Sequence, residues 1–164
     1  MRKAKKAGGF GVIEVLIASG IIGATIFSLY YIFVLGTRLS SDAGNKVSGN
    51  FLAEEGLEAA RFLRDSGWHA NISGLTPGTN YYVAFNKINS AWSIAASAPA
   101  PIDGVFYRTL TVENVSRDSD DNIVSSGGTV DPYTKKINIE VAWQGSGATS
   151  TILLSTYLAD LFEN

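Results

Sequence analysis

A single uncharged stretch constrains what this chain can form more than any other feature. The 21 residues from Val15 to Leu35 carry no charged side chain. As a helix they would extend over about 30 Å, the thickness of the hydrocarbon core of a bilayer. No later segment is comparably long and apolar. We therefore expect one membrane-length helix near the N-terminus, followed by a soluble body of about 130 residues.

The charge is distributed unevenly around this stretch. The net charge of −2 divides into +4 over residues 1–9 and −6 over the rest of the chain. Arg2, Lys3, Lys5 and Lys6 supply the positive charge, and we expect them to hold the N-terminus in the cytoplasm. The acidic remainder disfavours nucleic acid as a partner, because nucleic-acid binding needs a broad basic surface.

Two kinds of segment begin with basic residues followed by apolar ones. A secretory signal peptide has a shorter apolar core, of about 7–15 residues, followed by a small-x-small cleavage site. Here the sequence continues as Gly36-Thr37-Arg38-Leu39-Ser40, which offers no such site. A signal anchor that remains in the membrane fits better, with the C-terminal body outside the cytoplasm.

Glu14 is the one charged residue inside the apolar block, which begins at Phe10. A carboxylate at the centre of a membrane helix costs about 2.5–3.5 kcal/mol. Two interpretations remain open. Glu14 lies at the level of the lipid headgroups, where its cost is small, or it has a functional partner.

The residues before Glu14 complete a pattern. The stretch KKAGGFGVIEVLIASGIIG resembles the N-terminal motif of prepilins, the family of type IV pilins, minor pilins and type II secretion pseudopilins. That family has a short basic leader, a glycine, usually a phenylalanine, and a glutamate as the fifth residue of the mature chain. Gly9, Phe10 and Glu14 occupy these positions, whereas Gly11 departs from the threonine that the family often has. The match covers residues 1–36, and beyond it the resemblance is architectural.

The resemblance implies a function and a set of partners. A prepilin peptidase would cut between Gly9 and Phe10 and N-methylate the new Phe10 terminus. Glu14 would pair with the terminal amine of a neighbouring subunit. The partners would be other pilin subunits in a homo- or hetero-polymer, membrane lipid before assembly, and an inner-membrane assembly platform with a motor ATPase. The product would be an extracellular pilus or a periplasm-spanning filament, used in adhesion, motility or protein secretion.

Two alternatives remain. Within the family, the chain is a pseudopilin of a type II secretion or DNA-uptake machine. From a different class, it is a signal-anchored extracytoplasmic domain that binds a ligand or catalyses a reaction.

Helical periodicity continues beyond the uncharged stretch, to about Leu63. Apolar residues recur every four positions, which predicts one stripe packed on the body; its members are Leu39, Ala43, Val47 and Phe51, continued by Leu57, Ala60 and Leu63. Residues 44–50 contain two glycines and two asparagines, which weaken a helix. This segment is a tolerated soft patch, a break into two helices, or a region that melts on assembly.

Period-two alternation replaces the helical pattern after Asp65-Ser66-Gly67, which we expect to end the helix. The alternation predicts strands over residues 80–87, 91–96, 106–113, 136–143 and 152–158, with a hairpin between the last two. The sequence thus favours an α+β fold in which a long N-terminal helix packs on an antiparallel β head, the type IV pilin fold. The expected segments are a cleaved leader (1–9), a transmembrane or filament-core helix (10–36), an amphipathic helix (37–64) and the head (65–164).

Few residues suit catalysis or ligand binding. The chain has no cysteine and one histidine, His69, so we expect no enzyme activity and no cofactor. Asp118, Asp120 and Asn122 match positions 1, 3 and 5 of a calcium loop, but the loop lacks the expected glycine and the bidentate glutamate. They are weak calcium candidates beside the alternative of a solvated turn.

Aromatic residues are numerous, and they predict either packing or a surface that binds glycans. The residues concerned are Trp68, Tyr81, Tyr82, Trp92, Tyr107 and Trp143.

Overall fold

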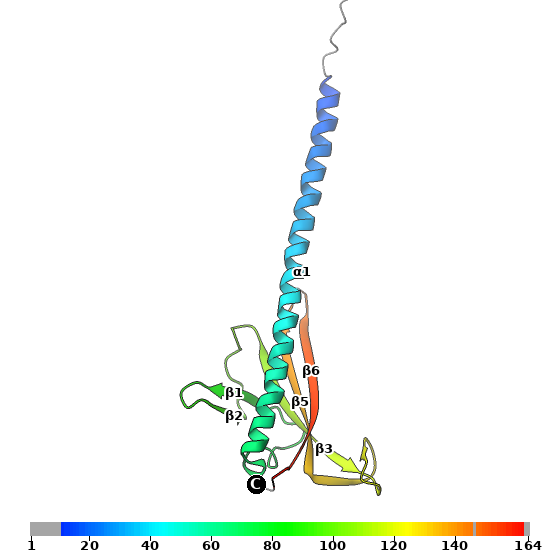
Figure 1. The fold of residues 1–164 in the computed structure, drawn as a ribbon. Coiled ribbons are helices and arrows are strands. Elements are labelled where there is room, and N and C mark those ends of the chain that lie inside the picture. Colours follow the sequence, from blue (N-terminus) through cyan, green and yellow to red (C-terminus); the bar gives the residue numbers. More distant parts are fainter. Residues whose placement is uncertain (1–10, 146, 163–164) are drawn as a thin grey trace, which may run out of the picture. The chain divides into compact units, whose positions relative to one another are not determined.

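The computed structural model describes residues 11–145 and 147–162. One long helix, α1 (Val12–Ser66), is followed by a short helix, α2 (Trp68–Asn71), and by antiparallel strands, which together make an α+β fold (Figure 1). The chain divides into two compact units, with the boundary between Ser41 and Asp42. The second unit therefore contains the C-terminal part of α1 together with every strand.

The expected end of α1 is confirmed. The helix stops at Ser66, and Gly67 follows with φ of 152°, a value that side-chain-bearing residues rarely adopt. Asn71 donates its Nδ2 proton to the carbonyl oxygen of Leu63 at 3.0 Å, which satisfies one of the orphan carbonyls of the last turn. Residues 44–50 are helical throughout, so the alternative of a break into two helices is wrong.

The strands form two sheets. β1 (Tyr82–Asn86) pairs with β2 (Ala91–Ala95) in a two-stranded sheet. The larger sheet has the order β4-β3-β5-β6 and consists of β3 (Tyr107–Arg117), β4 (Ile123–Val124), β5 (Thr129–Gln144) and β6 (Thr149–Ala159). All five predicted strands are confirmed, whereas α2, β4 and the first part of β5 were not predicted.

An irregularity in the pairing of β3 with β5 explains why the alternating pattern did not predict the first part of β5. Asn114 pairs with Lys135, but the next residue, Val115, pairs with Asp131. Residues 132–134 therefore have no partners on β3, and Pro132 is typical of such an interruption.

The core of the second unit lies between α1 and one face of the larger sheet. Small residues of α1 lie closest to the strands. A Cβ atom on Gly49 would lie 2.8 Å from the Trp143 ring, and one on Gly56 would lie 2.9 Å from Ile139. The buried side chains that the sheet contributes to this core are Leu110, Val112, Ile137, Ile139, Val141, Trp143 and Leu158.

The predicted apolar stripe is wrong in its first part. Leu39, Val47 and Phe51 are 61%, 56% and 66% exposed, and Ala43 is exposed as well. The buried face consists of Gly49, Ala53, Gly56, Leu57, Ala59, Ala60 and Leu63. The helix packs on the sheet through small residues because they allow its backbone to approach closely, and the larger apolar side chains point elsewhere.

Candidate functional site

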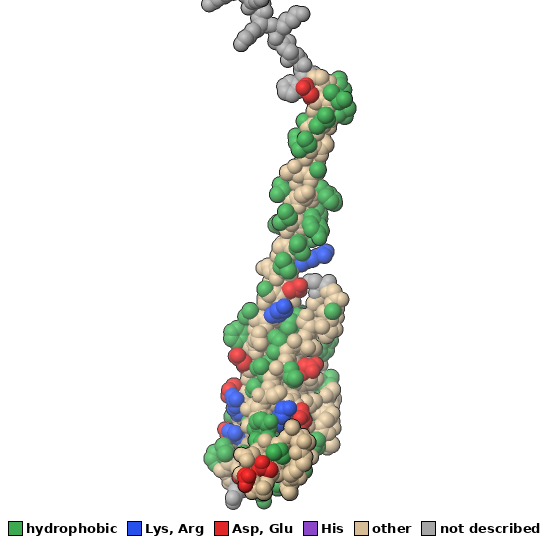
Figure 2. Space-filling model, turned by 90° about the vertical axis from the view of Figure 1, so that its right-hand side faces the viewer, with side chains coloured by type: hydrophobic (Ala, Val, Ile, Leu, Met, Phe, Trp, Pro, Cys, Tyr) green, Lys and Arg blue, Asp and Glu red, His purple; other side chains and the backbone are tan. Residues whose placement is uncertain are grey.

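The N-terminal stretch of α1 is apolar and exposed. By length and composition it can cross a membrane, and none of its most apolar window is buried. Figure 2 shows hydrophobic side chains along this part of the helix. Within it, the hydroxyls of Ser19, Thr25 and Ser28 donate to backbone carbonyls three or four residues earlier, at 2.8–2.9 Å. These hydroxyl donors are therefore satisfied without water, as an apolar environment requires.

Glu14 lies in the first turn of α1. Its Oε2 accepts a hydrogen bond from the backbone N–H of Gly11 at 2.9 Å. Because α1 begins at Val12, Glu14 is the third residue of the helix, and this contact is the glutamate half of a capping box. A carboxylate here is also stabilised by the positive end of the helix dipole.

The other residues of the predicted processing motif lie outside the described part of the chain. These are Arg2, Lys3, Lys5, Lys6, Gly9 and Phe10. Cleavage, methylation and the pairing of Glu14 therefore stay predictions.

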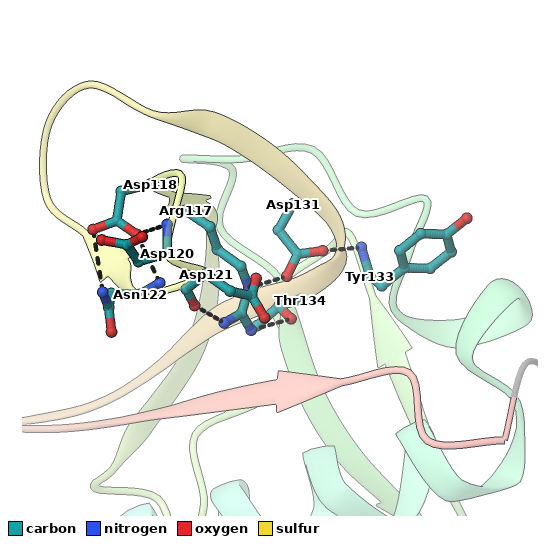
Figure 3. A network of polar contacts seen from close by, with 8 residues as sticks. All are labelled: Arg117, Asp118, Asp120, Asp121, Asn122, Asp131, Tyr133 and Thr134. Atoms are coloured by element: carbon teal, nitrogen blue, oxygen red, sulfur yellow. Dashed lines mark hydrogen bonds and ion pairs between the residues drawn. The ribbon is translucent and has the colours of Figure 1, made fainter.

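The weak calcium candidates lie in the turn between β3 and β4 (Figure 3). One Asp118 oxygen accepts from the backbone N–H groups of Asp120 and Asn122 at 2.9 Å, and the other accepts from Asn122 Nδ2 at 3.3 Å. These bonds, led by the Asn122 backbone N–H, lower the pKa of Asp118. Within the described residues, no group of three or more His, Cys, Asp or Glu side chains could hold a metal ion.

Arg117 supplies a positive charge at this turn. It donates from Nε to Asp131 at 2.8 Å and from Nη1 to the Asp121 carbonyl at 2.8 Å. Burial alone would raise the pKa of Asp131, but hydrogen bonds from Arg117, Thr134 and the Tyr133 N–H outweigh it and lower that pKa. The Arg117 guanidinium therefore holds the turn between β3 and β4 together, and this structural role accounts for Asp121 and Asp131.

The aromatic residues separate into two groups. Trp68 and Trp143 are 1% and 3% exposed and belong to the core, and the half-buried Tyr81 packs against it, so these three serve packing. Tyr82, Trp92 and Tyr107 instead line a cavity on the second unit. The single histidine, His69, is 63% exposed and lies 3.9 Å from Asp160, so it is a surface residue.

A buried arginine is the most unusual polar feature that the sequence analysis missed. The Arg108 side chain is only 4% exposed, and its Nη1 lies 2.6 Å from Glu55 Oε2. Arg108 also donates to the carbonyl oxygens of Leu52 and Val83, and thus connects α1, β1 and β3. Its position among Phe106, Leu110 and Val112 on one face of an alternating strand was a usable signal, because a charge there needs partners.

Comparisons of this chain with models of protein families, with curated proteins and with solved structures gave no match.

Proposed function

We propose that this chain is a structural subunit of a type IV pilus-like filament, cut between Gly9 and Phe10 and polymerised through the N-terminal part of α1. The observation that carries the proposal is the exposed run from Val15 to Leu35, which has Glu14 as the only charge at its start. A helix of this composition needs lipid or other helices around it.

The outward apolar residues of α1 support polymerisation beyond the membrane-length run. Val47 and Phe51, both on the second unit, are four residues apart and more than half exposed. Side chains at this spacing form a ridge that packs into the groove of another helix. Neighbouring copies of α1 would cover this ridge in a filament, and a simple membrane anchor would leave it in water.

Glu14 supports an ordered assembly. Cleavage before Phe10 would create a charged amine four residues from Glu14, which is about 6 Å along a helix axis. The bond from Gly11 occupies only one of the carboxylate oxygens. The other oxygen can accept from the amine of a neighbouring copy, and such a pair in an apolar filament would specify the axial register of the subunits.

The decisive experiment identifies the mature N-terminus. The full chain is produced in cells that contain a prepilin peptidase, and its N-terminal peptide is analysed by mass spectrometry. We expect a chain that starts at Phe10 with one added methyl group. Gly9→Val should block cleavage, whereas the matched control Gly8→Val should leave it intact. An intact Met1 in the unchanged protein would refute the proposal.

A signal-anchored binding domain is the second candidate, and one observation favours it. The second unit contains an aromatic cavity of about 270 Å³, and a purely structural subunit does not require one. The same mass spectrum separates the two candidates, because an anchored domain would retain its basic leader.

A further inference from the structure

A cavity on the second unit has the features of a small-molecule site. Its volume is about 270 Å³. The walls come from the β1–β2 hairpin, from the loop at residues 99–102 and from the start of β3. Its lining is mainly aromatic and aliphatic, and it includes Tyr82, Phe85, Trp92, Pro99, Pro101 and Tyr107. An apolar cavity with few polar groups is the usual form of a ligand pocket.

The aromatic wall is organised around two rings. Phe85 and Trp92 face each other across the β1–β2 pair, with ring centroids 5.2 Å apart and planes tilted by 60°. The guanidinium carbon of Arg108 lies 5.5 Å from the Trp92 ring centroid, within cation–π distance. Trp92 therefore connects the apolar wall to the one deeply buried charge of the cavity.

Arg108 has donors that the protein does not use. Its Nη1 serves Leu52 and Glu55, and its Nη2 serves Val83. The Nε–H is buried and has no hydrogen-bond partner. A guanidinium carries five N–H donors, and its Nε–Nη2 edge can donate to both oxygens of one carboxylate in a bidentate pair. An unpaired buried donor is costly, and Arg108 lines the cavity, so an acceptor that reached its guanidinium from the cavity would be favoured.

The charges that line the cavity select the sign of the ligand. Arg108 and Lys87 are positive, and Glu55 is the only acidic lining residue. Because Glu55 already pairs with Arg108, the charge of Lys87 is left uncompensated within the lining. A ligand with one negative charge would balance the site, and a cationic ligand would be repelled.

We propose that this cavity binds a small aromatic or apolar carboxylate, with its ring against Phe85 and Trp92 and its carboxylate directed toward Lys87 and Arg108. The site lies on the second unit alone and does not depend on how the chain assembles.

The test uses the full chain, labelled with 5-fluorotryptophan, in detergent micelles. Three tryptophans give three ¹⁹F resonances, and Trp92→Phe assigns the one that reports the cavity. The probes are 3-phenylpropionate and its neutral counterpart 3-phenylpropan-1-ol. We expect 3-phenylpropionate to shift the Trp92 resonance in a saturable way and to leave the Trp68 and Trp143 resonances in place.

Two lysine variants test the charge argument. Lys87→Gln should weaken 3-phenylpropionate binding about three- to fivefold, the effect expected for one exposed charge contact, and should leave alcohol binding unchanged. Lys46→Gln is the matched control, because Lys46 does not line this cavity. Both lysines are exposed, so the variants should fold.

Three results would overturn the proposal. One is the absence of a saturable Trp92 shift at millimolar 3-phenylpropionate. Another is equal affinity for the alcohol and the carboxylate. The last is an equal effect of the Lys46 and Lys87 substitutions, which would show that the Lys87 charge makes no specific contact.

Discussion

The two parts of α1 differ in the burial and in the size of their side chains. Up to Ser41, every described residue is exposed except Val34, which is half-buried, and the side chains are mostly large and apolar. From Gly49 onward, the buried positions are mainly glycine and alanine, which pack closely on the sheet. The first part leaves large apolar side chains exposed, and the second part brings its backbone close to the sheet of the second unit. Helical periodicity is the same in both, so side-chain size and partner make the difference.

The largest effect is expected at the start of the exposed part. Glu14→Val should abolish filaments in electron micrographs of sheared material, because the proposed partner of the terminal amine is lost. The thermal unfolding of the second unit should not change, since the hydrogen bond of Glu14 within the described residues lies in the first turn of α1. Normal filaments from this variant would disprove the pairing role, and Glu54→Gln, on an exposed position of α1, serves as the control.

The next effect concerns the polar connection between α1 and the sheet. Arg108→Met should lower the free energy of unfolding by about 2–4 kcal/mol, because the carbonyl oxygens of Leu52 and Val83 lose a buried donor. Glu55→Gln should cost less than about 1 kcal/mol, because that side chain is 49% exposed. Denaturant unfolding followed by near-ultraviolet circular dichroism measures both. Equal losses would mean that the ion pair, rather than the buried carbonyls, sets the cost.

The close approach of α1 can be tested by overpacking it. Gly56→Val should destabilise the protein by about 1–3 kcal/mol, because its side chain would collide with Ile139 and with the aliphatic part of Arg108. The same denaturant measurement applies. A more stable variant would show that the helix can move away from the sheet at little cost.

Acid should lower the stability of the second unit, because two carboxylates of its larger sheet have lowered pKa values. The pKa of Asp131 lies below its ordinary value of 3.8, and that of Glu113 lies below 4.5 owing to hydrogen bonds from Asn138 and Lys136. A carboxylate with a lowered folded-state pKa stabilises the fold above its unfolded value, and this stability is lost as the pH falls through the folded value. The melting temperature should therefore be flat from pH 7 to 5 and should fall below about pH 4.

Asp131→Asn is the matched test of this acid sensitivity. The variant should melt at a lower temperature at pH 7 and should lose less on acidification than the unchanged protein. An identical pH profile for the two would exclude the Arg117–Asp131 pair as a source of the dependence.

The smallest effect is expected at Gly44, where a side chain would contact no other residue closely. A Cβ atom on Gly44 would meet nothing within 4 Å, so Gly44→Ala should stabilise the helix by up to about 1 kcal/mol. The contrast with Gly56→Val separates a glycine required by packing from one that only weakens the helix. A loss of filaments from the stabilised variant would support the alternative that residues 44–50 must melt on assembly.

Local patterns predicted most of the fold. The length of α1, its end before Gly67 and the five strands follow from periodicity and from turn residues, which act over a few positions. Shorter elements escaped prediction because their signal is weak. α2 and β4 have only four and two residues, and the irregularity at 132–134 interrupts the alternation of β5.

The sequence by itself determined the membrane-length run, the position of Glu14 at its start and the division of charge between a basic N-terminal segment (residues 1–9) and an acidic remainder. These are properties of consecutive residues, and no fold is needed to read them. Only the tertiary structure decided which face of α1 is buried, since the sheet selects the small residues and leaves Val47 and Phe51 exposed. It also decided that Arg108 contacts Glu55 and Trp92. Glu55 and Arg108 are more than 50 positions apart in the sequence, and they become neighbours only because the helix packs on the strands.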